Sequence, residues 1–184
     1  FSAELTAEAA VELARSEAVR WVSLDAPMQS TACTQCVDTT KLANAYIRTI
    51  KADQAWNNSP YLQGQGIGVA VIDSGINDNG DLYTTAGQNR LVGDTSMNTD
   101  YNQNSSDGYG HGTVVSSIVG GDGSDSGGKY IGVAPKVNIF NVKVSNDDGS
   151  ATMTSVIQGL QWILDNKANY NIRVVNLSLN SIVA

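Results

Sequence analysis

The clearest pattern of hydrophobic and polar positions lies in residues 66–75, which read GIGVAVIDSG. A continuous run of small and β-branched apolar residues predicts a strand covered on both faces, as in the middle of a parallel sheet. The run stops abruptly at Asp73, Ser74 and Gly75. Ligands and chemistry collect at the carboxyl ends of strands in open α/β sheets, so Asp73 is a candidate functional residue.

Three further apolar segments extend this strand into a sheet. Residues 90–93 and 138–144 predict two more strands, and residues 172–181 predict a fourth. A helix that starts at Thr152 or Met153 and runs to Lys167 separates the last two, and its apolar side chains have the spacing of a core-facing stripe: Val156, Ile157, Leu160, Ile163 and Leu164. A β-α-β order requires a right-handed crossover, so we predict an α/β fold with a doubly wound parallel sheet.

The N-terminal residues have a different pattern. Thr6 can cap a helix that runs to about Ser16, and the alternation in residues 19–24 predicts a strand. Turn and polar residues without a sustained period follow. We therefore divide the chain into an α+β fragment over residues 1–30, a linker over residues 31–53 and a main domain over residues 54–184.

His111 is the only histidine in the chain, and it stands in the sequence Gly110-His111-Gly112-Thr113. The residues before this sequence are polar, whereas those after it are small or apolar. This change predicts an imidazole on the first turn of a buried helix, aimed at a cleft. A lone histidine is more often a structural residue than a catalyst, but its pairing with a strand-ending aspartate makes His111 a candidate for acid–base chemistry.

The segments Asp73-Ser74-Gly75 and Gly110-His111-Gly112-Thr113 together resemble the motifs of the subtilisin-like serine peptidases, in which an aspartate, a histidine and a serine follow in this order. The resemblance implies a serine endopeptidase in which His111 is the general base and Asp73 holds its tautomer. No cofactor is expected for catalysis.

The resemblance also implies that parts of the site come from elsewhere. The family's nucleophilic serine, in a Gly-Thr-Ser motif, and its oxyanion asparagine are expected after Ala184. We therefore expect this chain to be catalytically incomplete, with its sheet completed by a C-terminal remainder, either as a second chain or as further sequence. Residues 174–179 would otherwise form a long unpaired apolar edge.

In this family an extended polypeptide substrate lies between two edges and pairs with their backbones. The resemblance places Gly149, Ser150 and Ala151 on one edge and Ser178, Leu179 and Asn180 on the other. The family usually has glycine where Asn180 stands. A side chain at this position leaves the substrate preference open.

Two more features follow from the resemblance alone. Residues 1–30 resemble the second half of a subtilase propeptide, so the chain's own propeptide is an expected partner, and the junction between Tyr46 and Ile47 resembles a processing site. Asp81 stands where many members have an aspartate that binds a structural calcium ion. Asp81 is therefore a candidate calcium ligand.

Charge and cysteine content narrow the partners and the compartment. The 184 residues contain 11 Lys and Arg against 18 Asp and Glu, a net charge of −7 that argues against nucleic acid and anionic membranes as partners. Few lysines and many Asn, Ser, Thr and Gly favour a secreted, extracellular protein.

Cys33 and Cys36 lack the further ligands of a zinc site and the strand and helix of a thioredoxin-like site. We expect a short-loop disulfide between them, with pairing to cysteines outside the chain as the alternative.

Two other classes of function fit parts of this pattern. A subtilase-like domain that binds peptide without cutting it would lack the downstream Gly-Thr-Ser. A doubly wound ligand-binding domain of another family would leave Asp73 and His111 far apart.

Overall fold

A computed structural model describes residues 4–22, 33, 35–84, 87–98 and 104–180. The chain divides into two compact units, residues 1–34 and residues 35–184, and each is described by itself. Among the described residues, no helix combines the length and the apolar character that a membrane span requires.

The first unit contains helix α1, Ala7–Ala14, whose first turn is capped as predicted. The Thr6 hydroxyl accepts a hydrogen bond from the Ala9 amide at 3.2 Å. The strand predicted over residues 19–24 is wrong for residues 19–22, which form no regular structure, and its last two residues lie outside the described part of the chain. An isolated strand lacks hydrogen-bond partners, and the side chain of Trp21 is 80% exposed.

The second unit begins earlier than predicted, because residues 35–53 are not a linker. Helices α2, Ala45–Thr49, and α3, Ala52–Asn57, pack Ile47 and Trp56 against Ile131. The Trp56 indole donates a hydrogen bond to a backbone carbonyl 77 residues further along. The bond between Tyr46 and Ile47 lies within α2, and the Ile47 side chain is fully buried.

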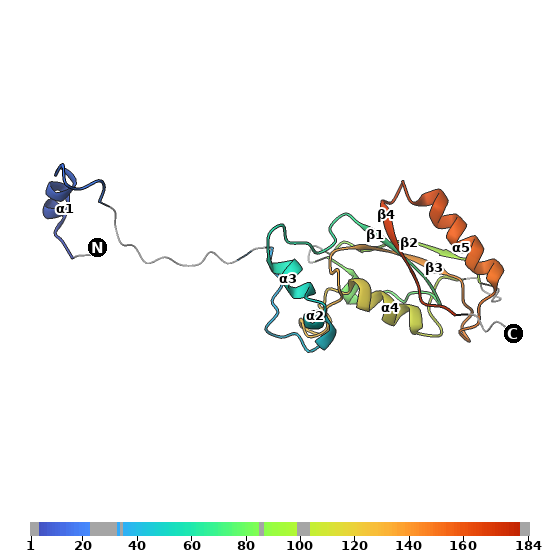
Figure 1. The fold of residues 1–184 in the computed structure, drawn as a ribbon. Coiled ribbons are helices and arrows are strands. Elements are labelled where there is room, and N and C mark those ends of the chain that lie inside the picture. Colours follow the sequence, from blue (N-terminus) through green and yellow to red (C-terminus); the bar gives the residue numbers. More distant parts are fainter. Residues whose placement is uncertain (1–3, 23–32, 34, 85–86, 99–103, 181–184) are drawn as a thin grey trace. The chain divides into compact units, whose positions relative to one another are not determined.

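Four parallel strands form the sheet of the second unit in the order β2-β3-β1-β4 (Figure 1). The strands are β1, Gly68–Asp73, β2, Leu91–Ser96, β3, Asn138–Lys143, and β4, Ile172–Leu177. The predicted doubly wound α/β fold is confirmed. Strand β2 extends past the predicted end at Gly93 because its residues 94–96 continue to pair with β3.

The two main helices cover opposite faces of the central strands, which fixes where the core lies (Figure 1). Val69 and Val71 of β1 face the side chains of α4, His111–Gly120, whereas Ala70 and Ile72 face those of α5, Met153–Asn166. All six residues of β1 are buried. Because successive side chains of a strand point to opposite faces, this unbroken apolar run is what a two-sided core requires.

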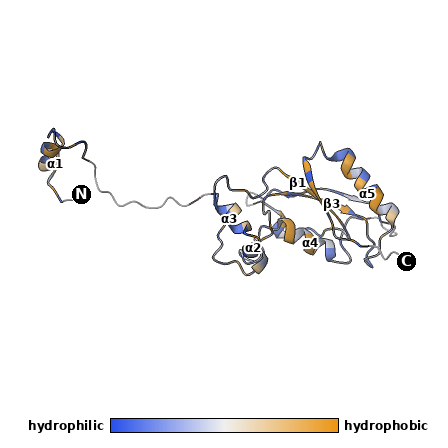
Figure 2. Cartoon of the chain, in the orientation of Figure 1, coloured by the Kyte–Doolittle hydropathy of each residue, from blue (hydrophilic) through white to orange (hydrophobic). Residues whose placement is uncertain are grey.

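Helix α5 packs on the sheet with a face that agrees with the predicted one only in part, at Ile163 and Val156. Its buried residues are Ser155, Gly159 and Ile163, spaced four apart. A Cβ atom at Gly159 would lie 3.0 Å from methyl groups of β3 and of the residue that follows it, so the small side chains permit a close approach. Four other apolar side chains of the helix are exposed: Met153, Ile157, Leu160 and Leu164. Figure 2 shows hydrophobic colour along much of α5.

Hydrophobic side chains also remain exposed on α4 and β4. The sequence predicted a buried helix after His111. Val114 and Ile118 of α4 are exposed, so this helix is buried only in part. Strand β4 is an edge of the described sheet, and Val174, Val175 and Leu177 are exposed along it.

Candidate active site

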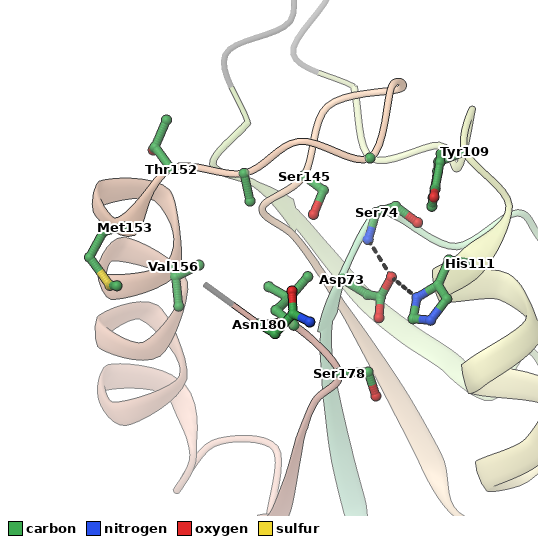
Figure 3. A pocket seen from close by; sticks show the side chains of 13 residues that line it. Asp73, Ser74, Tyr109, His111, Ser145, Thr152, Met153, Val156, Ser178 and Asn180 are labelled. Atoms are coloured by element: carbon green, nitrogen blue, oxygen red, sulfur yellow. Dashed lines mark hydrogen bonds and ion pairs between the residues drawn. The ribbon is translucent and has the colours of Figure 1, made fainter. Parts of the chain in front are cut away.

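Asp73 and His111 meet at the carboxyl edge of the sheet, where β1 ends and α4 begins (Figure 3). Asp73 Oδ1 lies 2.7 Å from His111 Nδ1, and it also accepts the Ser74 amide at 2.8 Å. The carboxylate side chain is 2% exposed and the imidazole 44%. The carboxylate makes Nδ1 the protonated nitrogen of a neutral ring, which leaves Nε2 as the acceptor.

This distance contradicts the expectation for a doubly wound domain of another family, in which the two residues would lie far apart. The pair is instead a histidine whose tautomer is held by a buried carboxylate. Such a pair can take a proton from a bound hydroxyl and return it to a leaving group.

Glycines allow the strand end and the helix start to come this close. A Cβ atom at Gly112 would lie 2.1 Å from the carbonyl oxygen of Gly75 and 3.1 Å from Asp73 Cβ. Gly75 has a φ of +114° and would itself place a Cβ 2.4 Å from the Ser106 carbonyl oxygen. The glycines beside Asp73 and His111 in the sequence are therefore required by backbone packing.

A cleft of about 790 Å³ opens in front of this pair. Five of the six predicted substrate-edge residues line it: Gly149, Ala151, Ser178, Leu179 and Asn180. The sixth, Ser150, instead binds Asp148 Oδ1 with both its hydroxyl, at 2.6 Å, and its amide, at 2.8 Å. Figure 3 places Asp73 between His111 on one side and the first turns of α5 on the other.

The sequence did not predict several other lining residues: Ser74, Tyr109, Ser145, Thr152, Met153 and Val156. The ring of Tyr109 lies against Gly149, where a Cβ atom would be 2.8 Å from two ring carbons. Tyr109 is two residues from His111, so its proximity to the motif was an available signal. Met153 and Val156 are three apart at the start of a helix, a spacing that puts both on one face.

Asp107 is a further buried residue beside the pair that the sequence did not single out. Its carboxylate accepts hydrogen bonds from Ser74, Gly110 and Thr113. Burial alone would raise the pKa of Asp107, but the hydrogen bonds from Thr113, Ser74 and Gly110 outweigh burial and lower it.

Asp81, the candidate calcium ligand, lies on the short 3₁₀ helix η1, Gly80–Leu82. Its Oδ1 accepts the Asp125 amide at 2.7 Å. Burial, together with the charges of Asp125 and Asp122, raises the pKa of Asp81. In the described part of the chain, no three His, Cys, Asp or Glu side chains are grouped to hold a metal ion, and calcium binding stays a prediction.

The two cysteines are both engaged in a disulfide. Neither Cys33 nor Cys36 is a free thiol. In this state neither sulfur is a thiolate that could bind zinc.

Comparison with known proteins gives a consistent picture. The model of the subtilase family matches residues 64–183. The serine protease AprX of Bacillus subtilis (strain 168) is 36% identical over 115 residues, which cover 61% of this chain and 24% of that protein. The minor extracellular protease Epr of the same strain is 33% identical over 135 residues, 73% of this chain and 18% of that protein.

The solved structure of the Clostridium perfringens CspB protease has a similar fold, with a TM-score of 0.59 at 23% identity, over 72% of this chain and 33% of that chain. The chain thus spans about a quarter of the length of AprX and less of Epr.

Proposed function

Because this chain belongs to the subtilase family, we propose that it supplies the acid–base half of a serine endopeptidase. The observation that carries the proposal is the 2.7 Å contact between Asp73 Oδ1 and His111 Nδ1, with the imidazole exposed to the cleft and the carboxylate buried. The similarity to AprX, a serine protease, supports the same class of reaction.

In the proposed reaction, His111 Nε2 takes the hydroxyl proton of a serine as that oxygen attacks the peptide carbonyl carbon. The imidazolium then gives this proton to the nitrogen of the leaving amine, and the C–N bond breaks. A water molecule repeats the sequence to release the acyl group. Throughout, Asp73 keeps the ring in the productive tautomer and stabilises the imidazolium charge.

We place the serine nucleophile and the oxyanion asparagine beyond residue 184. The family motif Gly-Thr-Ser does not occur between His111 and Ala184. The small share of each relative that the chain covers is consistent with a longer catalytic domain. The exposed apolar side chains along edge strand β4 support a partner segment that pairs with it.

The substrate of the proposed enzyme is an extended polypeptide. It would lie between the edge formed by Gly149 and Ala151 and the edge formed by residues 178–180, all of which border the cleft. The side chain of Asn180 lines the same cleft and is therefore placed to contact the substrate.

We also propose that the protein acts outside the cell and that residues 1–30 belong to its propeptide. Disulfide-bonded cysteines persist in oxidising compartments, which supports an extracellular location. The similarity to Epr, an extracellular protease, supports the same location.

A fluorophosphonate probe, which labels activated serines, tests the reaction in the full-length protein. We expect labelling of the wild type and its loss in Asp73→Asn and His111→Ala. The matched control is Asp38→Asn, which changes a carboxylate that binds Thr40 on the surface, away from the cleft. This variant should be labelled as fast as the wild type.

A folded wild-type protein that is not labelled would contradict the peptidase proposal. That result, together with binding of an unstructured peptide in the cleft, would favour the alternative of a non-catalytic peptide-binding domain.

A further inference from the structure

Asp107 is enclosed by hydrogen-bond donors at the start of α4. Oδ1 accepts the Ser74 hydroxyl and the Gly110 amide, both at 2.7 Å. Oδ2 accepts the Thr113 amide at 2.8 Å and the Thr113 hydroxyl at 2.6 Å. The residue is 4% exposed, and the four groups that bind its carboxylate are all donors. An ionised carboxylate fits this site because it only accepts hydrogen bonds.

These contacts connect the two polypeptide segments that carry the Asp73–His111 pair. Ser74 directly follows Asp73, and its hydroxyl oxygen accepts the Gly112 amide at 3.0 Å while its proton goes to Asp107. Gly110 and Gly112 flank His111. The backbone on each side of the histidine is therefore bound to a group that is fixed to the end of β1.

Helix α4 has no capping side chain at its N-cap position. The N-cap residue of α4 is Gly110, which has a φ of +93° and no side chain to accept the first amides. Asp107, three residues earlier, satisfies the Gly110 and Thr113 amides instead. It does so while also binding Ser74, which an ordinary N-cap residue does not do.

We propose that Asp107 is a positioning residue of the active site, which holds the His111 imidazole within hydrogen-bond reach of Asp73. This inference rests on the proposed function, because the position of the imidazole matters for turnover only where His111 acts as general base. Asp107 itself acts through the backbone of the His111 turn and through Ser74, with no contact to the reacting groups.

The sharpest variant is Asp107→Asn, which keeps the size of the side chain and replaces one acceptor oxygen by an NH₂ donor. That NH₂ group must face either Ser74 and Gly110 or the two donors of Thr113. The hydrogen bonds on the side that it faces are then lost, because two donors cannot bind each other. A displacement of about 1 Å in a catalytic group can cost on the order of 100-fold in rate. We therefore expect kcat to fall by roughly 10- to 100-fold, with KM unchanged, because the substrate edges stay in place.

A second readout does not depend on turnover. His111 is the only imidazole of the 184-residue chain, so ¹⁵N chemical shifts of labelled histidine report its tautomer directly. We expect the Nδ1-protonated form in the wild type and a mixture with the Nε2-protonated form in Asp107→Asn. In full-length protein, the His111→Gln variant identifies the signal among any other histidines.

Asp38→Asn is the matched control, because Asp38 Oδ1 also accepts the amide and the hydroxyl of one threonine, Thr40, on the surface. Should Asp107→Asn fail to fold, Ser74→Ala takes its place, since it removes the link between Asp107 and the Gly112 amide. We expect Ser74→Ala to shift the tautomer of His111 in the same direction as Asp107→Asn. Asp38→Asn should be indistinguishable from the wild type.

The outcomes separate a positioning role from a plain helix cap. A folded Asp107→Asn protein with the wild-type tautomer and kcat within twofold of the wild type would overturn the proposal, even if its stability fell. If Asp107→Asn does not fold, a wild-type tautomer in Ser74→Ala overturns it. If the wild-type protein resists the fluorophosphonate probe, the proposed peptidase function fails, and the tautomer measurement still decides the role of Asp107.

Discussion

Helices α4 and α5 cover opposite faces of one sheet and border one cleft, yet they are held in different ways. The start of α4 is fixed by specific polar contacts and by glycine packing against the end of β1. Helix α5 rests on the sheet through Ser155, Gly159 and Ile163 and leaves a row of apolar side chains exposed. The side of the cleft that carries His111 is therefore held by contacts within this chain. On the other side, α5 exposes apolar side chains.

The largest expected effect comes from removing the charge of Asp73, which ends β1 and contacts His111 at the start of α4. Asp73→Asn should lower turnover on the order of 10⁴-fold, since the equivalent change in a Ser-His-Asp triad favours the wrong tautomer at about that cost. Across the cleft, Met153→Ala shortens an exposed side chain and should change kcat/KM by at most about 10-fold. Single-turnover kinetics on a peptide substrate measure both. Equal losses in the two variants would contradict the contrast between the two sides.

Glycine substitutions compare the two helices directly. Gly112→Ala places a Cβ atom 2.1 Å from a backbone oxygen, which cannot move aside without displacing the end of β1. We expect a stability loss of about 1–3 kcal/mol and a fall in kcat of roughly 100-fold. Urea unfolding and steady-state kinetics give the two values.

Gly159→Ala in α5 is the control for that experiment. Its Cβ atom would meet only methyl groups of Val142 and Val144 at 3.0 Å, which can shift by a few tenths of an ångström. Alanine favours the helix by about 1 kcal/mol over glycine, which offsets the crowding. A stability within about 1 kcal/mol of the wild type is expected, and a loss as large as that of Gly112→Ala would show that the two helices pack alike.

The sequence predicted that Asp73 and His111 belong to one site because each has a local signal. Asp73 ends an apolar strand and His111 begins a helix between glycines, so both stand where the chain changes from one structure to another. Asp107 has no such signal, because its contact with Ser74 joins residues 33 apart within a polar loop. Only the folded chain brings its four donors together.

The packing face of α5 was predicted only in part, at Val156 and Ile163, and the reason is physical. Periodicity identifies where apolar side chains lie on a helix, but it does not reveal which face allows the closest approach to a sheet. Ser155 and Gly159 pack inward because they are small, and Leu160 and Leu164 remain outside. Residues 35–53 show a related limit, because the periodic pattern over residues 41–50 did not reveal that Ile47 is fully buried against the main domain.

Two neighbouring side chains of α5 sharpen this point. Ile163 is 5% exposed and belongs to the core with Ile72 and Val142, whereas Leu164 is 55% exposed. Ile163→Ala should cost about 2–4 kcal/mol of unfolding free energy, and Leu164→Ala less than about 1 kcal/mol. Urea titrations at one temperature compare the two. A larger loss at Leu164 would mean that the exposed row is covered in solution, for example by a further segment of the protein.

The smallest expected effect is a difference in acid sensitivity between the two sides. Hydrogen bonds lower the pKa of Asp107, and bonds from Ser150 lower that of Asp148, beside the cleft edge. A carboxylate whose pKa is lowered in the folded state stabilises the fold above its unfolded pKa, near 3.8, and this contribution disappears as the pH falls through the folded-state value.

Asp107 and Asp148 should nevertheless respond differently, because only the first is shielded from solvent. Asp107→Asn should be less stable than the wild type at pH 6, with a difference that shrinks toward pH 3 and persists in 1 M salt. Asp148 lies fully exposed, so its ionic contribution is screened and Asp148→Asn should match the wild type at every pH. Urea unfolding of the two variants and the wild type at pH 6 and pH 3, with and without salt, measures these differences. A salt-sensitive loss at Asp107 would place its carboxylate in contact with bulk water and remove the physical basis for treating the α4 side as the rigid half of the site.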